Sequence, residues 1–154
     1  MDKSTVLRFF RNGILIFLVM FAMVWAKTYH AGNAQFNEGE KNLKINNVKD
    51  AITNYETAIH MYTPLSGYVP DSAQRLWEIG QDFEKSGDYD WALIAYRSLR
   101  SSFYAVRSFY TPYQEWIDRT EKQIDLVLAA KQQQEMAARP GNPQEPISGG
   151  QQSR

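Results

Sequence analysis

The residue types that could carry out chemistry are sparse in this chain. His30 and His60 are its two histidines, and it contains no cysteine. Neither histidine belongs to an HxxxH or HExxH pattern, so the sequence does not encode the paired imidazoles of a zinc site. Ser-His-Asp catalysis would have to use a histidine without any surrounding signature, and no glycine-rich phosphate loop occurs. We therefore expect that the protein is not an enzyme, has no catalytic residue, metal or other cofactor, and takes no small-molecule substrate.

Four acidic residues stand close together in the middle of the chain: Asp82, Glu84, Asp88 and Asp90. Alternating acids can bind calcium, but this run lacks the terminal glutamate of an EF-hand loop. A structural interpretation is simpler. Asp88 follows Ser86-Gly87 and is expected to cap a helix, and the other three acids are expected to be solvated.

A stripe of arginines is the best candidate for recognition chemistry. Arg97, Arg100 and Arg107 recur at spacings of three and seven, which places them on one face of a helix, with Tyr104 near that face. Guanidinium groups interleaved with tyrosine suit the binding of a carboxylate-bearing peptide, so these four residues are the predicted partner-binding residues. The alternative is pairing within the chain, with the acidic stretch 78–90. The sequence does not decide between them.

The aromatic residues in and after this stripe exceed what one small core needs: Phe103, Tyr104, Phe109, Tyr110, Tyr113 and Trp116. We expect part of this set to pack on a protein partner, such as a larger membrane complex. Lys+Arg and Asp+Glu both total 17, and the formal net charge is zero. Nothing in this balance indicates nucleic-acid binding.

One uncharged apolar run lies near the start of the sequence. It covers fourteen residues and is the predicted membrane-spanning segment: Gly13, Ile14, Leu15, Ile16, Phe17, Leu18, Val19, Met20, Phe21, Ala22, Met23, Val24, Trp25 and Ala26. As a helix it spans about 21 Å, which is short of a hydrocarbon core of about 30 Å. Counting from Phe9 to Tyr29 reaches that thickness if the flanking cations snorkel.

The same run allows two fates, an uncleaved signal anchor or a cleaved signal peptide. Val24-Trp25-Ala26 is a possible cleavage site, although Trp25 is bulky for it. Trp25 and Tyr29 sit where interfacial aromatics are expected in an anchor. Arg8 and Arg11 favour a cytoplasmic N-terminus, so either fate puts the following domain in the periplasm or otherwise outside the cytoplasm. The expected location is the inner (cytoplasmic) membrane, with a single pass.

The rest of the chain has the residue pattern of helices separated by short breaks. Apolar residues follow three-and-four spacing in long stretches without proline, and the Pro/Gly-bounded segment 64–70 separates two hairpins, with Asp71-Ser72 as the expected cap. We predict an all-α protein: a membrane or signal segment at 1–31, antiparallel helical hairpins with a terminal helix at 32–134, and a disordered Gln/Pro/Gly/Ser tail at 135–154.

The two hairpins share one template. In each copy a glycine stands twelve residues before an alanine, and a tyrosine follows the alanine four residues on. The copies are offset by 41 residues. The predicted repeat-packing residues are Gly39, Ala51, Tyr55, Gly80, Ala92 and Tyr96.

This template resembles the tetratricopeptide repeat over residues 32–106. The resemblance implies helical hairpins that approach closely at a small residue, and a protein-binding function. The first copy departs from the pattern at Gln35, Glu38 and Asn42, and the offset exceeds the typical period of about 34 residues. The expected function is a membrane-anchored adaptor or scaffold, an accessory or assembly subunit of a bacterial envelope complex. The alternative is a cleaved, soluble periplasmic or secreted binding protein of the same fold.

Overall fold

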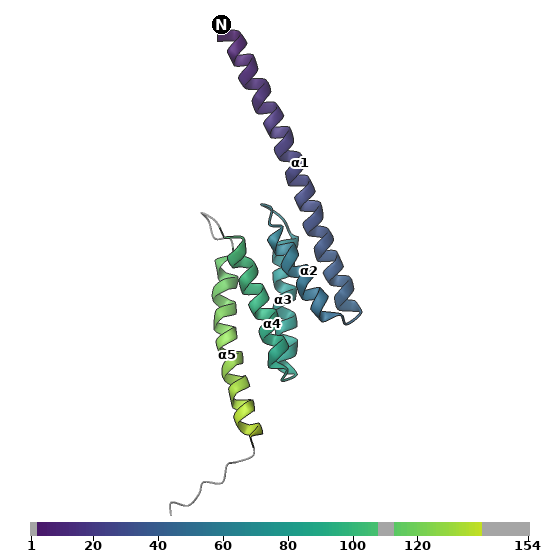
Figure 1. Cartoon of the computed structure of the whole chain (residues 1–154), viewed down its shortest axis with the longest axis vertical. Helices are drawn as coiled ribbons and strands as arrows, with labels where there is room; N and C mark the ends of the chain where they lie inside the picture. Colours follow the sequence, from purple (N-terminus) through teal and green to yellow (C-terminus); the bar gives the residue numbers. More distant parts are fainter. Residues whose placement is uncertain (1–2, 108–112, 140–154) are drawn as a thin grey trace, which may run out of the picture.

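The computed structural model describes residues 3–107 and 113–139, and every regular element in those ranges is an α-helix. The helices are α1 (Lys3–Lys44), α2 (Val48–His60), α3 (Tyr68–Lys85), α4 (Tyr89–Ala105) and α5 (Gln114–Ala138) (Figure 1). The all-α prediction is confirmed. Helix α5 continues to Ala138, past the predicted boundary at residue 134, and the predicted tail from residue 140 onward lies outside the described residues.

Helix α1 joins the apolar run to the rest of the molecule without a break. All residues of the run are exposed except Ala26, which is half-buried. From Arg11 onward this helix is long and apolar enough to cross a membrane, a description that a signal sequence would also meet. The predicted boundary between residues 31 and 32 is therefore not a structural boundary, because the same helix enters the domain (Figure 1).

The domain consists of two antiparallel hairpins and one covering helix. The C-terminal half of α1 pairs with α2, α3 pairs with α4, and α5 packs along α4 (Figure 1). Gly87 adopts a φ of 77°, and the Asp88 carboxylate accepts a hydrogen bond of 3.3 Å from the backbone N–H of Trp91. The predicted glycine stop and aspartate cap between α3 and α4 are confirmed.

The start of α3 differs from the predicted cap at Asp71-Ser72. The helix begins at Tyr68, so Pro70 lies in its first turn, where a missing backbone N–H costs no helical hydrogen bond. The Ser72 hydroxyl donates to the Tyr68 carbonyl at 2.7 Å instead of capping the helix. The proline did not mark the end of the loop, and this prediction was wrong.

The core runs through both hairpins and into α5. Its largest fully buried side chains include Tyr55, Tyr96, Phe103, Leu76 and Ile117. Much of the aromatic surplus is absorbed inside the chain, since Phe103 is fully buried and Tyr113 and Trp116 pack half-buried against the core. Phe109 and Tyr110 lie outside the described residues.

Candidate functional site

Two glycine–tyrosine crossings hold the second helix of each hairpin in place. A Cβ added to Gly39 would lie 2.7 Å from the Tyr55 ring, and one added to Gly80 would lie 2.5 Å from the Tyr96 ring. Both tyrosines and the alanines four residues before them, Ala51 and Ala92, are fully buried. The same contact thus recurs in both hairpins, at the glycine and tyrosine positions that the two copies of the sequence template share, and it fixes α2 and α4 against α1 and α3.

Each crossing tyrosine is also tied by its hydroxyl to a glutamate. Tyr55 donates to Glu40 at 2.7 Å, and Glu40 accepts two further hydrogen bonds from Arg75 of the next hairpin at 2.7 and 3.1 Å. Tyr96 donates to Glu84 at 3.0 Å, and Glu84 accepts from Gln123 of α5. These polar bridges connect each hairpin to the helix that follows it.

The electrostatics of the first bridge favour the charged pair. Burial opposes ionisation of Glu40, but the hydrogen bonds from Tyr55 and Arg75 and the Arg75 charge outweigh it, so the pKa of Glu40 is lowered. The hydrogen bond to Glu40 likewise raises the pKa of Arg75. Burial, followed by the hydrogen bond to Glu40, raises the pKa of Tyr55, which keeps its hydroxyl a donor.

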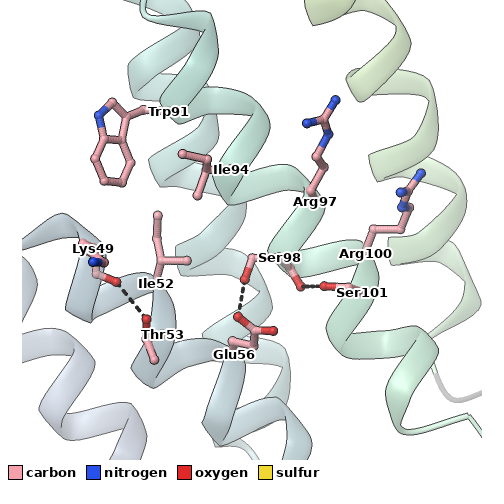
Figure 2. Close-up of a pocket in the computed structure, with 10 residues that line it drawn as sticks. All are labelled: Lys49, Ile52, Thr53, Glu56, Trp91, Ile94, Arg97, Ser98, Arg100 and Ser101. Carbon is pink, nitrogen blue, oxygen red and sulfur yellow. Dashed lines mark hydrogen bonds between the residues drawn. The ribbon is translucent and has the colours of Figure 1, made fainter.

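A groove of about 440 Å³ lies between α2 and α4, the second helices of the two hairpins. Ile52 of α2 faces Trp91 and Ile94 of α4, which form its apolar part (Figure 2). Ile94 is 47% exposed, and Trp91 is held by stacking on Phe83 with ring centroids 5.7 Å apart. An exposed isoleucine beside a fixed indole is a surface that an apolar side chain of another molecule can cover.

The polar edges of this groove are mainly basic. Lys49 lies on the α2 side, and Arg97 and Arg100 lie on the α4 side. Figure 2 shows both guanidinium groups extending away from α2. One acid also lines the groove, Glu56, which accepts a hydrogen bond of 2.7 Å from Ser98. The groove therefore has an apolar centre with two arginines beside it on the α4 side, and neither arginine pairs with an acid within residues 3–107 and 113–139.

The alternative role for the arginine stripe is not found in the described part of the chain. Within residues 3–107 and 113–139, neither Arg97 nor Arg100 makes an ion pair. The acids of 78–90 have other partners: Glu78 pairs with Arg75, Asp82 with Lys85 and Asp90 with Lys131, and Glu84 accepts from Tyr96 and Gln123.

The other two predicted partner-binding residues lie apart from the groove, at the C-terminal end of α4. The Tyr104 hydroxyl donates to Glu121 of α5 at 2.8 Å, which raises the pKa of Tyr104. The Arg107 guanidinium lies 5.2 Å from the centroid of the Tyr104 ring. The structure thus brings Arg97 and Arg100 together at one site and assigns Tyr104 a contact within the chain.

The two histidines are the remaining candidates for chemistry. His30 and His60 are exposed and lie on different helices, α1 and α2. Among the described residues, no group of three or more His, Asp or Glu side chains is arranged to hold a metal ion. Among the described residues, the α2–α4 groove therefore remains the candidate site.

Lys49, Ile52, Trp91 and Ile94 are site residues that the sequence reasoning did not single out. The apolar spacing along α4 contained one indication of this site. Ile94 falls outside the buried stripe of the helix and is an apolar residue on a polar face. Nothing in the sequence indicated that α2 would lie opposite it.

No family model, curated protein or solved structure matches this chain.

Proposed function

We propose that this protein is a membrane-anchored helical-repeat adaptor, of the tetratricopeptide-like kind, that serves as an accessory or assembly subunit of a bacterial envelope complex. Its domain would lie outside the cytoplasm and bind a protein partner. The observation that carries the proposal is the α2–α4 groove, where exposed Ile94 lies beside Arg97 and Arg100, which lack ion pairs among the described residues.

The chemistry of the groove supports one class of ligand. Its apolar centre suits a hydrophobic side chain, and the cations at its edges suit carboxylates on either side of that side chain. The proposed ligand is therefore an acidic segment of a membrane-complex subunit with an apolar residue in its middle. Charge-assisted hydrogen bonds from arginine would fix its orientation, and burial of Ile94 would contribute most of the affinity.

A photo-crosslinking experiment tests this assignment. A photoreactive phenylalanine analogue replaces Ile94 in the full chain, and a matched variant carries it at Leu126, which is 62% exposed on α5. After irradiation of native membranes, we expect an adduct from position 94 whose crosslinked peptide contains Asp or Glu near an apolar residue. We expect no such adduct from position 126.

Charge reversal then tests the arginines. Arg97→Glu combined with Arg100→Glu should abolish the adduct without changing helicity, because both side chains project from the surface of α4. Lys85→Glu combined with Lys122→Glu changes the same net charge at exposed positions away from the groove and should leave the adduct intact. An unchanged adduct in the arginine variant, or no adduct from position 94, would contradict the proposed function.

A further inference from the structure

The end of the domain nearest the apolar run has its own surface, formed by the loop between α2 and α3. In Figure 1 this loop lies beside α1 close to the end of the apolar segment, whereas the α1–α2 turn lies at the opposite end. The inference that follows rests on the proposed anchoring, because it requires the apolar run to cross a bilayer.

A series of aromatic contacts links the end of the run to this loop. Trp25 stacks on Tyr29 with ring centroids 5.5 Å apart, and Tyr29 meets the Tyr68 ring edge-on at 5.6 Å. A Cβ on Gly32 would lie 2.4 Å from the Tyr68 ring, so α1 passes directly against it. Trp25 and Tyr29 are four residues apart, about 6 Å along the helix. The domain therefore begins within about one helical turn of the interfacial tryptophan.

The loop is held in a fixed shape. The Tyr68 hydroxyl donates to the Met61 carbonyl at 2.6 Å and lies 3.0 Å from the Thr63 hydroxyl. The Ser66 backbone N–H donates to the Thr63 carbonyl at 3.1 Å. Thr63 and Ser66 are buried, although they flank the most exposed residue of the loop.

That residue is Leu65. It is fully exposed, at 101% of the reference area, and its φ of 68° is unusual for a residue with a side chain. A single exposed leucine is ordinary in a soluble protein. Here it projects from an ordered loop at the end of the domain that the continuous helix α1 directs toward the bilayer.

We propose that the α2–α3 loop is a membrane-contact surface, with Leu65 inserted into the interfacial region of the lipid bilayer. The unbroken helix sets the height of the loop, and the Trp25–Tyr29–Tyr68 contacts hold it beside the span. The domain would then be attached to the membrane at two places, through α1 and through this loop. This would restrict its tilt and leave the α2–α4 groove facing sideways along the membrane surface.

The absence of cysteine allows a direct measurement with single reporters. Full-length Leu65→Cys, Ile45→Cys and Val19→Cys are each labelled with a polarity-sensitive fluorophore and reconstituted into phosphatidylcholine–phosphatidylglycerol vesicles. Ile45 is the matched control, because it is a 72%-exposed apolar residue in the turn at the far end of the domain. Spin-labelled lipids then report which fluorophores reach the bilayer.

We expect quenching at positions 19 and 65, and a water-like signal at position 45. Quenching at 19 with identical water-like signals at 65 and 45 would overturn this inference and leave the anchoring intact. A water-like signal at 19 would overturn the anchoring itself. If position 65 is water-like in vesicles but protected in native membranes, the loop contacts a protein and the lipid assignment is wrong. Pro64→Cys, at an exposed neighbouring position, gives a second reporter should labelling at 65 perturb the turn.

Discussion

Tyr55 and Tyr96 determine how closely the helices of each hairpin can approach. Each ring lies where a glycine of the preceding helix has no side chain, and each hydroxyl donates to a glutamate. Because both rings are fully buried and held at both ends, they cannot move aside for a larger residue. The glycines opposite them should therefore be the least replaceable positions of the domain.

Gly80→Leu should destabilise the protein by about 3 kcal/mol and reduce the cooperativity of unfolding, because the new side chain would occupy the volume of the Tyr96 ring. Gly67→Leu is the control, since a Cβ at Gly67 meets nothing within 4 Å. That variant should change stability by less than about 0.5 kcal/mol. Urea unfolding of the full chain in detergent, followed by circular dichroism, measures both. Equal effects would show that Gly80 does not lie at a close crossing.

Glu40→Gln should lower the free energy of unfolding by about 1 kcal/mol at pH 7, because the charge-assisted bridge to Arg75 is lost. The effect is modest because both side chains of this pair are partly exposed to water. The folded state lowers the pKa of Glu40 below its ordinary value of 4.5. The stabilisation is therefore complete above that value and disappears as the pH falls through the folded-state pKa.

Unfolding measured from pH 7 down to pH 3 should show the wild type losing its advantage over Glu40→Gln at the acid end. Glu38→Gln provides the comparison, since Glu38 makes an exposed pair with Lys41 within one helix. It should differ little from wild type at any pH. A constant difference between wild type and Glu40→Gln across this range would contradict the assigned pKa shift.

The equivalence of the two hairpins could be predicted from the sequence, whereas the bridge to Arg75 could not. Gly39 and Tyr55 belong to one hairpin, and the identical spacing of Gly80 and Tyr96 marked both pairs as equivalent. Arg75 lies in the other hairpin, 35 residues from Glu40. Their meeting depends on how one hairpin stacks on the next, which the periodicity of a single helix does not encode.

Helix α5 packs along α4 and covers a side of it that would otherwise be exposed. Its buried residues are Ile117, Thr120, Ile124 and Val127, which recur every three or four positions. At its start, the Arg119 guanidinium lies 3.9 Å from the centroid of the Trp77 ring. Helix α5 therefore completes the second hairpin in the way that α3 completes the first.

Val127→Asp should separate α5 from α4 and destabilise the protein by about 3 kcal/mol, because a carboxylate would be buried without a partner. Leu126→Asp is an internal control at the adjacent position, where the leucine is 62% exposed. It should change stability by less than about 0.5 kcal/mol. Thermal unfolding in detergent compares the two, and similar melting temperatures would mean that α5 is not packed through this face.

Element boundaries were predictable where the chain carries explicit signals. Gly87 and Asp88 mark the α3–α4 turn, because a positive φ favours glycine and an aspartate can cap a helix. Pro70 misled the prediction, since proline is tolerated in the first turn of a helix as well as in a loop. The sequence has no helix-ending residue between positions 31 and 32, and helix α1 is continuous there.

For the full chain, the proposed anchoring predicts an intact mass that includes the apolar run. A mature form beginning near Lys27 would instead support the cleaved, soluble alternative. Such cleavage would leave the packed part of α1 in the domain, since Tyr29, Gly32 and Phe36 follow that point. Mass spectrometry of the protein purified from membranes distinguishes the two forms.

The orientation can be measured with the same single-cysteine approach. Ile45→Cys should react with a membrane-impermeant maleimide added from outside the cytoplasmic membrane, and Ser4→Cys should react only after the membrane is permeabilised. The physical reason is the retention of Arg8 and Arg11 on the cytoplasmic side. The opposite labelling pattern would place the domain in the cytoplasm.

The groove could be predicted only in part, because it is a property of the assembled hairpins. Arg97 and Arg100 were visible as a periodic stripe on one helix. Ile52 and Lys49 belong to α2, and only the stacking of the hairpins places them opposite that stripe. A site formed by two repeats can be recognised only when the relative position of the repeats is known.

The continuity of α1 also has a consequence for biosynthesis. A segment that enters hydrocarbon must form all its backbone hydrogen bonds internally, so insertion of the apolar run entails a helix. Nucleation is the costly step of helix formation, and each further residue adds a hydrogen bond with little extra cost. Because Lys3–Lys44 is one helix, the part that enters the domain can elongate from a turn already formed in the membrane. We expect this helix to exist before α2 is synthesised, and to serve as the template on which the repeats assemble outward from the bilayer.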